Sequence, residues 1–306
     1  MPEDVPGIHH VTAVGSDPAE NRTFYTETLG LRLVKRSVNQ DDVSVYHLFY
    51  GDREGSPGTS MTVFPYPDAA PGRPGRGQAT AVAFLVPADA VGYWADRLEA
   101  RGHAVERTER FGDPVLSFAD PDGLPLELVG REDAPAGLPA EGPVPPDRTV
   151  RGFFGVTLSL ASADGTAALL RAMGYQRTDA DRDRRRFTTH GDLGYAVDLC
   201  EDPNARRGRP GAGTVHHVAF RTTQAEHASW RDVLYEQGLH PSEVIDRTWF
   251  ESIYVREPGG VLFEFATDGP GYTVDEEREH LGERLVLPEW LEDRRAAIEA
   301  GLPALE

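Results

Sequence analysis

Cysteine and lysine are almost missing from this chain of 306 residues, which contains one cysteine, Cys200, and one lysine, Lys35. A single cysteine cannot form an intramolecular disulfide, and it excludes a Cys-x-x-Cys redox centre and a site built from several thiolates. No run of residues approaches the roughly 18 apolar residues of a membrane span. The first residues, MPEDVPGIHH, lack the positive charge and apolar stretch of a signal peptide. These absences predict a protein of a reducing compartment, the cytoplasm.

Basic residues are outnumbered, since 50 acidic residues against 31 lysines and arginines give a net charge of −19. An acidic surface repels the phosphates of nucleic acids and of anionic lipids. We therefore expect neither nucleic acid nor a membrane as a partner. With 39% hydrophobic residues, the composition is that of a globular protein, and its length allows about two domains.

Four internal repeats organise the chain. In each repeat a strand pattern leads into an amphipathic helix that ends at a glycine. These glycines, at intervals of 72, 72 and 64 residues, are Gly30, Gly102, Gly174 and Gly238. Glycine readily adopts the left-handed conformation that ends a helix. Since about three strand patterns rich in β-branched and aromatic residues follow each helix, the repeat is a βαβββ module.

Residues 132–150 are rich in Pro, Ala and Gly, a composition typical of a linker. They divide the chain into an N-terminal domain, residues 1–131, and a C-terminal domain, residues 151–267, with two modules each. Residues 268–306 form an extension whose helical pattern, LPEWLEDRRAAIEAG, we expect to cover a cleft or a subunit contact. The predicted fold is α+β, with four βαβββ modules in two tandem pairs.

The motif His-His-Val occurs at the same point of the first and fourth modules, at residues 9–11 and 216–218. Successive strand residues point to opposite faces, and the apolar residues around the motif assign His10 and His217 to the face away from the helices. Glu264 lies on the corresponding face of the last strand pattern, VLFEFAT. These three side chains converge if the first and fourth modules pack together.

Two neutral imidazoles and a carboxylate form the facial triad of non-haem Fe(II) oxygenases, although Mn(II) and catalytic Zn(II) accept similar ligands. Repetition of the motif at equivalent points favours a metal site between the first and fourth modules over isolated structural histidines. The acids at the equivalent positions of the second and third modules, Glu127 and Asp198, lack histidine neighbours. We expect these two acids to be structural.

Longer motifs accompany the histidines. They are GIHHVT at residues 7–12, YHL at 46–48 followed by GSPGT at 55–59, and FESIYVREPGG at 250–260. Through them the chain resembles, over nearly its whole length, the vicinal oxygen chelate superfamily, which comprises glyoxalases, bleomycin-resistance proteins and extradiol dioxygenases. Within that superfamily the motifs are similar to those of the hydroquinone-type ring-cleaving dioxygenases.

The resemblance implies an enzyme that opens a hydroquinone, or a related diol such as a catechol, and incorporates both atoms of O2. It implies an Fe(II) ion, sometimes Mn(II), at residues matching His10, His217 and Glu264. The surrounding positions that it implies as orienting or acid–base residues are His9, Thr12, His216, Arg247 and Tyr254. We also expect a homo-oligomer.

The residues themselves leave several of these roles open. Tyr254 either exchanges a proton with the substrate or is a core aromatic residue. Arg247 either holds a phenolate or peroxide anion or is ion-paired at the surface. His9 and His216 either orient the metal ligands or are structural. His47, within the aromatic run YHLFY, is expected to serve in packing.

Two other functions stay open. A glyoxalase-like isomerase or lyase would stabilise an enediolate with Zn(II) or Ni(II), but such sites generally need a fourth protein ligand, and the second and third modules offer no histidine for it. A protein that sequesters small molecules, as bleomycin-resistance proteins do, would need the cavity without the metal. A requirement for O2 and the metal content separate these functions from ring cleavage.

Overall fold

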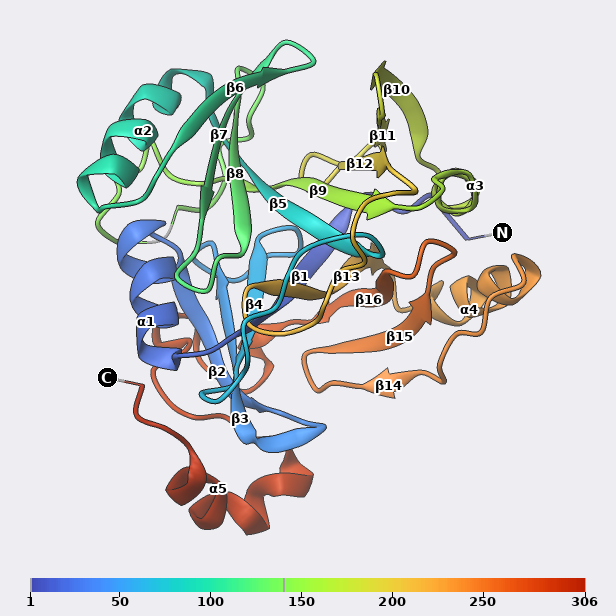
Figure 1. Ribbon diagram of the computed structural model, residues 1–306. Coiled ribbons are helices and arrows are strands. Elements are labelled where there is room, and N and C mark those ends of the chain that lie inside the picture. Colours follow the sequence, from blue (N-terminus) through green and yellow to red (C-terminus); the bar gives the residue numbers. More distant parts are fainter. Residues whose placement is uncertain (1, 140, 306) are drawn as a thin grey trace.

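The computed structural model describes residues 2–139 and 141–305 and contains two curled eight-stranded sheets with few helices (Figure 1). The first sheet has the spatial order β14 (Ile245–Asp246), β15 (Phe250–Arg256), β16 (Leu262–Pro270), β13 (Thr214–Thr222), β1 (Ile8–Gly15), β4 (Ser60–Pro65), β3 (Asp42–Gly51) and β2 (Arg32–Asn39). The second has the order β10 (Gln176–Asp181), β11 (Arg184–Thr188), β12 (Ala196–Glu201), β9 (Gly152–Leu160), β5 (Gln78–Pro87), β8 (Pro125–Arg131), β7 (Asp113–Ala119) and β6 (Glu106–Arg110).

The helices are short and flank the sheets. They are α1 (Pro18–Thr23), which continues as a π-helical turn (Phe24–Thr28), α2 (Val91–Ala100), α3 (Asp164–Ala172), α4 (His227–Glu236) and α5 (Arg295–Gly301). Single 3-10 segments are Ala88–Ala90, Tyr272–Val274, Arg278–His280 and Glu289–Arg294. Within the described part of the chain, no helix is both long and apolar enough to cross a membrane.

Each of the two sheets is built from two of the four modules. The first and fourth modules share one sheet through the antiparallel pair β1 and β13, and the second and third share the other through β5 and β9. The predicted fold of four βαβββ modules is confirmed, and the chain closes as a bracket, outer modules together and inner modules together. The predicted boundaries at residues 131, 150 and 267 remain predictions.

The glycine signals at the helix ends are confirmed by the backbone. Gly30, Gly102, Gly174 and Gly238 have φ angles of 70°, 86°, 92° and 76°, in the left-handed region that L-residues with a side chain rarely adopt. At the other end of α1, the side chain of Asp17 accepts hydrogen bonds from the amides of residues 19 and 20. Local sequence chemistry therefore sets where these helices start and stop.

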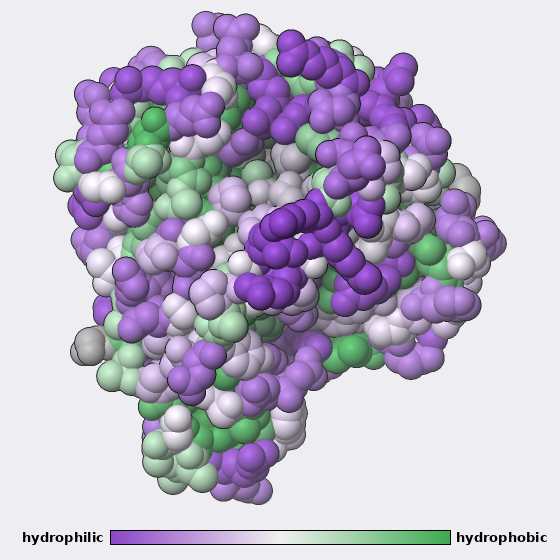
Figure 2. All heavy atoms as spheres, viewed as in Figure 1, coloured by the Kyte–Doolittle hydropathy of each residue, from purple (hydrophilic) through white to green (hydrophobic). Residues whose placement is uncertain are grey.

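Apolar side chains on the helix-facing sides of the strands form the main core. Several of these strand residues are completely buried and pack with helix residues such as Trp230; they include Val11, Val218, Phe263 and Phe265. The surface, by contrast, is mostly hydrophilic in the view of Figure 2, with hydrophobic areas near α5. The concave, polar faces of the strands remain available for a site.

The sole lysine anchors the C-terminal extension. The Lys35 side chain is completely buried, with Nζ 2.5 Å from Asp275 Oδ1 and 2.5 Å from Glu276 Oε2. Its Nζ also lies 5.5 Å from the ring centre of Trp249. Further along, the amide of Val286 donates to the carbonyl of residue 36. The extension thus lies along β2 and packs on the first sheet, held by a buried charge cluster.

We predict that Lys35→Met lowers the free energy of unfolding by about 3–5 kcal/mol, because it leaves the buried carboxylate of Glu276 without its cation. Urea denaturation followed by circular dichroism measures the change. Arg284→Ala is the matched control, since the exposed Arg284 Nε lies 3.9 Å from Glu276 Oε1 and should contribute little. Equal, small effects of both variants would contradict this account of the cluster.

Candidate metal centre and aromatic cavity

Three neighbouring strands of the first sheet carry the predicted metal ligands. β16, β13 and β1 lie side by side and present Glu264, His217 and His10 on the concave face. His10 Nε2 lies 3.2 Å from His217 Nε2, and Glu264 Oε2 lies 2.9 Å from His217 Nε2 and 3.4 Å from His10 Nε2. Among the described residues, this is the one group of three His, Cys, Asp or Glu side chains whose ligand atoms all lie within 4.8 Å of one another.

The chemistry of this group fits a divalent metal ion. All three side chains are buried, and Glu264 Oε2 has no hydrogen-bond partner although it is completely shielded from solvent. Metal–ligand bonds of roughly 2.1 Å that meet at right angles separate the ligand atoms by about 3 Å, close to the distances given above. An unpaired carboxylate oxygen between two imidazole nitrogens is costly without a cation, and a metal would remove that cost.

The ionisation of the Glu264 carboxylate agrees with a metal-binding role. Burial alone would raise the pKa of Glu264, but the imidazoles of His10 and His217 hold it well below its usual range. Its other oxygen, Oε1, accepts a hydrogen bond of 2.6 Å from Ser252 Oγ. Glu264 is therefore ionised and oriented, with Oε2 directed at the imidazole nitrogens.

Each of the two imidazoles is backed by the histidine that precedes it. His9 Nδ1 lies 2.9 Å from His10 Nδ1, and His216 Nδ1 lies 2.8 Å from His217 Nδ1. A histidine that binds a metal through Nε2 is protonated on Nδ1, and that N–H must donate to an acceptor. The preceding histidine supplies the acceptor in both cases. The repeated His-His motif thus places a candidate ligand beside a candidate orienting partner in both strands.

The position of His216 differs from the simple alternation of strand residues. Alternation assigns it to the apolar face with Val218 and Phe220, but only the latter two are buried in the core, whereas His216 is exposed and lines the cavity with His217. Its ring turns across the strand because Nδ1 bonds to His217 Nδ1. Hydrogen bonding between neighbouring side chains outweighs the strand period here.

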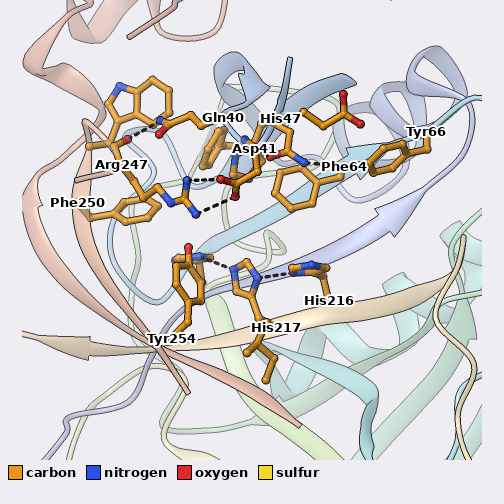
Figure 3. Close-up of a pocket in the computed structure, with 16 residues that line it drawn as sticks. Gln40, Asp41, His47, Phe64, Tyr66, His216, His217, Arg247, Phe250 and Tyr254 are labelled. Carbon is orange, nitrogen blue, oxygen red and sulfur yellow. Dashed lines mark hydrogen bonds and ion pairs between the residues drawn. The ribbon is translucent and has the colours of Figure 1, made fainter. Parts of the chain in front are cut away.

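A cavity of about 440 Å³ opens above the three side chains (Figure 3). This volume suits a small organic ligand. His10 and His217 form part of its floor, and its walls are largely aromatic, with contributions from Phe49, Phe64, Tyr66, Trp249, Phe250 and Tyr254. Flat apolar walls over a polar floor favour a planar ring that carries polar substituents.

Tyr254 and Arg247 both border the cavity, as the resemblance implies. The ring of Tyr254 lies 5.7 Å from that of His217, and burial raises the pKa of its hydroxyl above the usual range, so it stays protonated. The Arg247 guanidinium lies 5.5 Å from the ring centre of Tyr254 and forms an ion pair of 2.9 Å with Asp41. In Figure 3 this ion pair faces Tyr254 and His217 across the cavity.

Thr12 completes the predicted set, and its hydroxyl lies 2.8 Å from His217 Nε2. The sequence analysis missed three polar residues of the site: Ser252, Thr62 and Asp41. Ser252 shares the strand face of Tyr254, and this alternation is a signal that points to it. Asp41 lies in the turn between β2 and β3, more than 200 residues from Arg247, and no local pattern marks it.

His47 both packs and faces the site. Its ring is held between Phe49 and Phe64, at ring-centre distances of 3.8 Å and 4.3 Å, so the expected packing is present. It also lines the cavity, and its Nε2 lies 2.9 Å from Thr62 Oγ1. Packing is therefore only one of its contacts.

The equivalent acids of the second sheet are neutralised by arginines. Glu127 pairs with Arg110 through two contacts of 2.7 Å and 2.8 Å. Asp198 accepts from Arg186 at 2.8 Å and 2.9 Å, and also from Arg184 at 2.9 Å. These side chains need no metal to balance their charge, in keeping with the structural role expected of them.

Comparisons with known proteins agree with the fold. Residues 7–128 match the Glyoxalase/Bleomycin resistance protein/Dioxygenase superfamily. The chain is 43% identical over 308 residues to a protein of Bacillus subtilis (strain 168) named "Putative ring-cleaving dioxygenase MhqO", covering 100% of this chain and 98% of the relative. It is 35% identical over 306 residues to the chlorohydroquinone/hydroquinone 1,2-dioxygenase of Sphingobium indicum, covering 95% and 94%.

Solved structures extend the comparison. A Bacillus subtilis crystal structure titled "putative dioxygenase" has a TM-score of 0.96 and 42% identity, covering 99% of this chain and 98% of that one. Glyoxalase I of Zea mays shares the fold, with a TM-score of 0.63 and 15% identity over 86% and 92% of the chains. The chain therefore belongs to the glyoxalase/bleomycin resistance protein/dioxygenase superfamily. Within it, the chain groups with the dioxygenases, so it is an oxidoreductase, as predicted.

We predict that Ser252→Ala weakens Fe(II) binding about 10- to 100-fold, because Glu264 Oε1 loses the hydroxyl that orients it. Anaerobic competition against a chromophoric chelator measures the affinity. Ser37→Ala is the matched control, since Ser37 is equally buried in the same sheet and its hydroxyl has no partner. Equal affinities of the two variants would contradict the orienting role of Ser252.

We also predict that the metal-free protein loses stability as the pH is lowered below about 6.5. Burial lowers the pKa of His9 and of His217 in the folded chain, whereas the unfolded chain protonates both near pH 6.5. The unfolded state then holds more protons, so acid favours it. Urea midpoints between pH 8 and pH 5, with EDTA present, test this, and His9→Gln should flatten the slope. An unchanged midpoint across this range would refute the prediction.

Proposed function

We propose that this chain is an Fe(II)-dependent ring-cleaving dioxygenase that opens a hydroquinone-type aromatic ring with O2 and incorporates both oxygen atoms. The single observation that carries the proposal is the group of His10, His217 and Glu264 at the base of an aromatic cavity: the two histidines line the cavity, and Glu264 Oε2, buried against them, makes no hydrogen bond. The names of the relatives MhqO and chlorohydroquinone/hydroquinone 1,2-dioxygenase support the same reaction class. A cytoplasmic location and a homo-oligomer are part of this proposal.

His10, His217 and Glu264 would hold the ion, with Mn(II) as the alternative to Fe(II). When bound, such an ion supplies the redox activation of O2 and lowers the pKa of a coordinated hydroxyl. The protein contributes positions and tautomers: His9 and His216 fix the ring orientation of the two imidazoles, and Ser252 fixes the carboxylate. The remaining contributions of the protein come from the side chains that surround the substrate.

The cavity walls orient the substrate ring. A hydroquinone fits between the aromatic side chains with one hydroxyl at the floor, near His10 and His217, and the other toward the ion pair of Arg247 and Asp41. This placement converts a bimolecular encounter into a reaction within one complex. Trp249 lines the same cavity, so its bulk limits the substituents that the ring can carry.

Tyr254 and Arg247 handle charge during cleavage. The hydroxyl of Tyr254 stays protonated because burial raises its pKa, which suits it to donate a proton to an oxygen of the opening ring. The guanidinium of Arg247 then stabilises the negative charge that develops on the substrate. Asp41 keeps this guanidinium at the cavity and reduces its net charge. The product is a ring-opened acid or acyl derivative.

The two alternative functions are less consistent with the site. A glyoxalase-like isomerase would need a fourth protein ligand, and among the described residues no fourth ligand side chain joins His10, His217 and Glu264. A protein that only sequesters its ligand has no need for an ionised, unpaired carboxylate oxygen beneath the cavity. Both alternatives predict behaviour that is independent of O2.

O2 uptake tests the proposal directly. The protein is purified without O2, loaded with Fe(II), and supplied with hydroquinone, methylhydroquinone or catechol in parallel. We expect one O2 consumed per ring opened for at least one diol, and a loss of about 10³-fold or more in Glu264→Gln, which removes the ligand charge. No O2 uptake with any of these diols would reject the ring-cleaving function, and turnover without O2 would favour the isomerase.

A further inference from the structure

The C-terminal extension holds one wall of the main cavity in place. Trp249 lines that cavity and is 1% exposed. Its indole Nε1 donates a hydrogen bond of 2.8 Å to Asp275 Oδ2, and its carbonyl oxygen accepts one of 2.8 Å from the amide of Gly271. Both partners lie beyond residue 267, in the extension. A segment outside the four modules therefore positions a side chain that a bound ligand would meet.

Asp275 is the residue of the extension that orients the indole. Its two carboxylate oxygens take different donors: Oδ1 accepts from Lys35 Nζ at 2.5 Å, and Oδ2 accepts from the indole N–H. The ring of Phe49 meets the indole in a T-shaped contact, at a ring-centre distance of 5.4 Å. Because a buried N–H without an acceptor costs free energy, the indole stays in place as long as Asp275 accepts its hydrogen bond.

A second, smaller cavity lies behind this wall. It has a volume of about 170 Å³ and shares Trp249 and Phe250 with the main cavity. Its other walls include Tyr272 of the extension and residues 54–57, most of which belong to the GSPGT motif. Trp249 and Phe250 thus separate two spaces. A displaced indole would join them and give a ligand additional room on this side of the main cavity.

We propose that Asp275 is a positioning residue that limits the size of the ring substituents accepted by the site, because it fixes Trp249 as the wall between the two cavities. This inference rests on the proposed dioxygenase function and specifies the substrates of the same site. Hydroquinones with hydrogen or a small group on the side facing Trp249 fit the main cavity. Those with a bulky group on that side require the space behind the indole and are rejected.

The chain offers a matched pair of substitutions. Asp275 and Glu276 both bind Lys35 Nζ, each at 2.5 Å, so in Asp275→Asn and in Glu276→Gln the remaining carboxylate still neutralises the buried ammonium group. Of the two, it is Asp275 that accepts from the indole N–H. In Asp275→Asn the amide oxygen is drawn to Lys35, and the amide NH2 then faces the indole N–H. Two donors repel each other, so the indole moves.

Equilibrium binding measures the size limit without turnover. Protein loaded with Zn(II), which has no redox chemistry, is titrated by calorimetry with hydroquinone and with 2,5-di-tert-butylhydroquinone, which carries a substituent on each side of the ring. We expect wild type and Glu276→Gln to bind the substituted diol at least about tenfold more weakly than hydroquinone. Asp275→Asn should reduce this difference to about threefold or less, and Asp275→Ala should act in the same direction.

Two further measurements distinguish positioning from a loss of stability. In the Fe(II)-loaded enzyme, Asp275→Asn should lower KM for the substituted diol and leave kcat for hydroquinone within about threefold of wild type. Acrylamide quenching of indole fluorescence is measured in a Trp290→Phe background, which removes an indole that is 61% exposed. Quenching should increase in Asp275→Asn, whose Trp249 has moved, and stay unchanged in Glu276→Gln.

The outcomes separate this inference from the proposed function. An equal size preference in wild type, Asp275→Asn and Asp275→Ala would overturn the positioning role of Asp275 while leaving the dioxygenase function intact. The same holds if Glu276→Gln relaxes the preference as much as Asp275→Asn, since the effect would then come from the charge beside Lys35. A wild-type protein that neither binds hydroquinone nor consumes O2 with it would overturn both.

Discussion

The antiparallel pairing of β1 with β13 is the interaction on which the rest of the structure depends. It places Thr12 opposite His217 and His10 opposite Ala219, although these residues are about 200 positions apart in the chain. Because side chains alternate along both strands, a shift of one residue in this register would turn a ligand toward the helices. Val11 and Val218, which pair in the same register and are buried in the core, hold the register by hydrophobic packing. The site thus inherits its precision from a core that lies on the other side of the sheet.

The two sheets solve the same electrostatic problem in different ways. Each holds buried carboxylates on its polar face, and a buried carboxylate needs a compensating cation. The second sheet carries its own cations, since Arg110 pairs with Glu127 and Arg186 pairs with Asp198. The first sheet offers only imidazoles to Glu264, and one carboxylate oxygen is left unpaired. The sequence difference between the modules, arginine in one case and histidine in the other, therefore separates a self-contained sheet from one that the proposed metal ion would complete.

Much of the fold was predictable because its signals are local and repeated. The four glycines mark helix ends through a backbone conformation, and the paired His-His-Val motifs mark equivalent strands. The identity of Ser252 was within reach, since it shares the strand face of Tyr254. Strand alternation assigns His216 to the apolar face, whereas its ring lines the cavity, because alternation ignores hydrogen bonds between adjacent side chains. Asp41 lay beyond prediction, since its partner Arg247 approaches it only after the first and fourth modules have joined. Local periodicity specifies faces, whereas contacts between distant turns depend on the assembled sheet.

The burial of Lys35 has a consequence for the chemistry of the whole surface. It is the one lysine of the sequence, and its ammonium group is enclosed by Asp275, Glu276 and the ring of Trp249. The folded protein therefore presents no ε-amine to acylating reagents, bifunctional cross-linkers or enzymes that conjugate other proteins to lysine. Modification of this residue would require the C-terminal extension to detach from the sheet. Reactivity of a single amine thus reports whether that extension is docked.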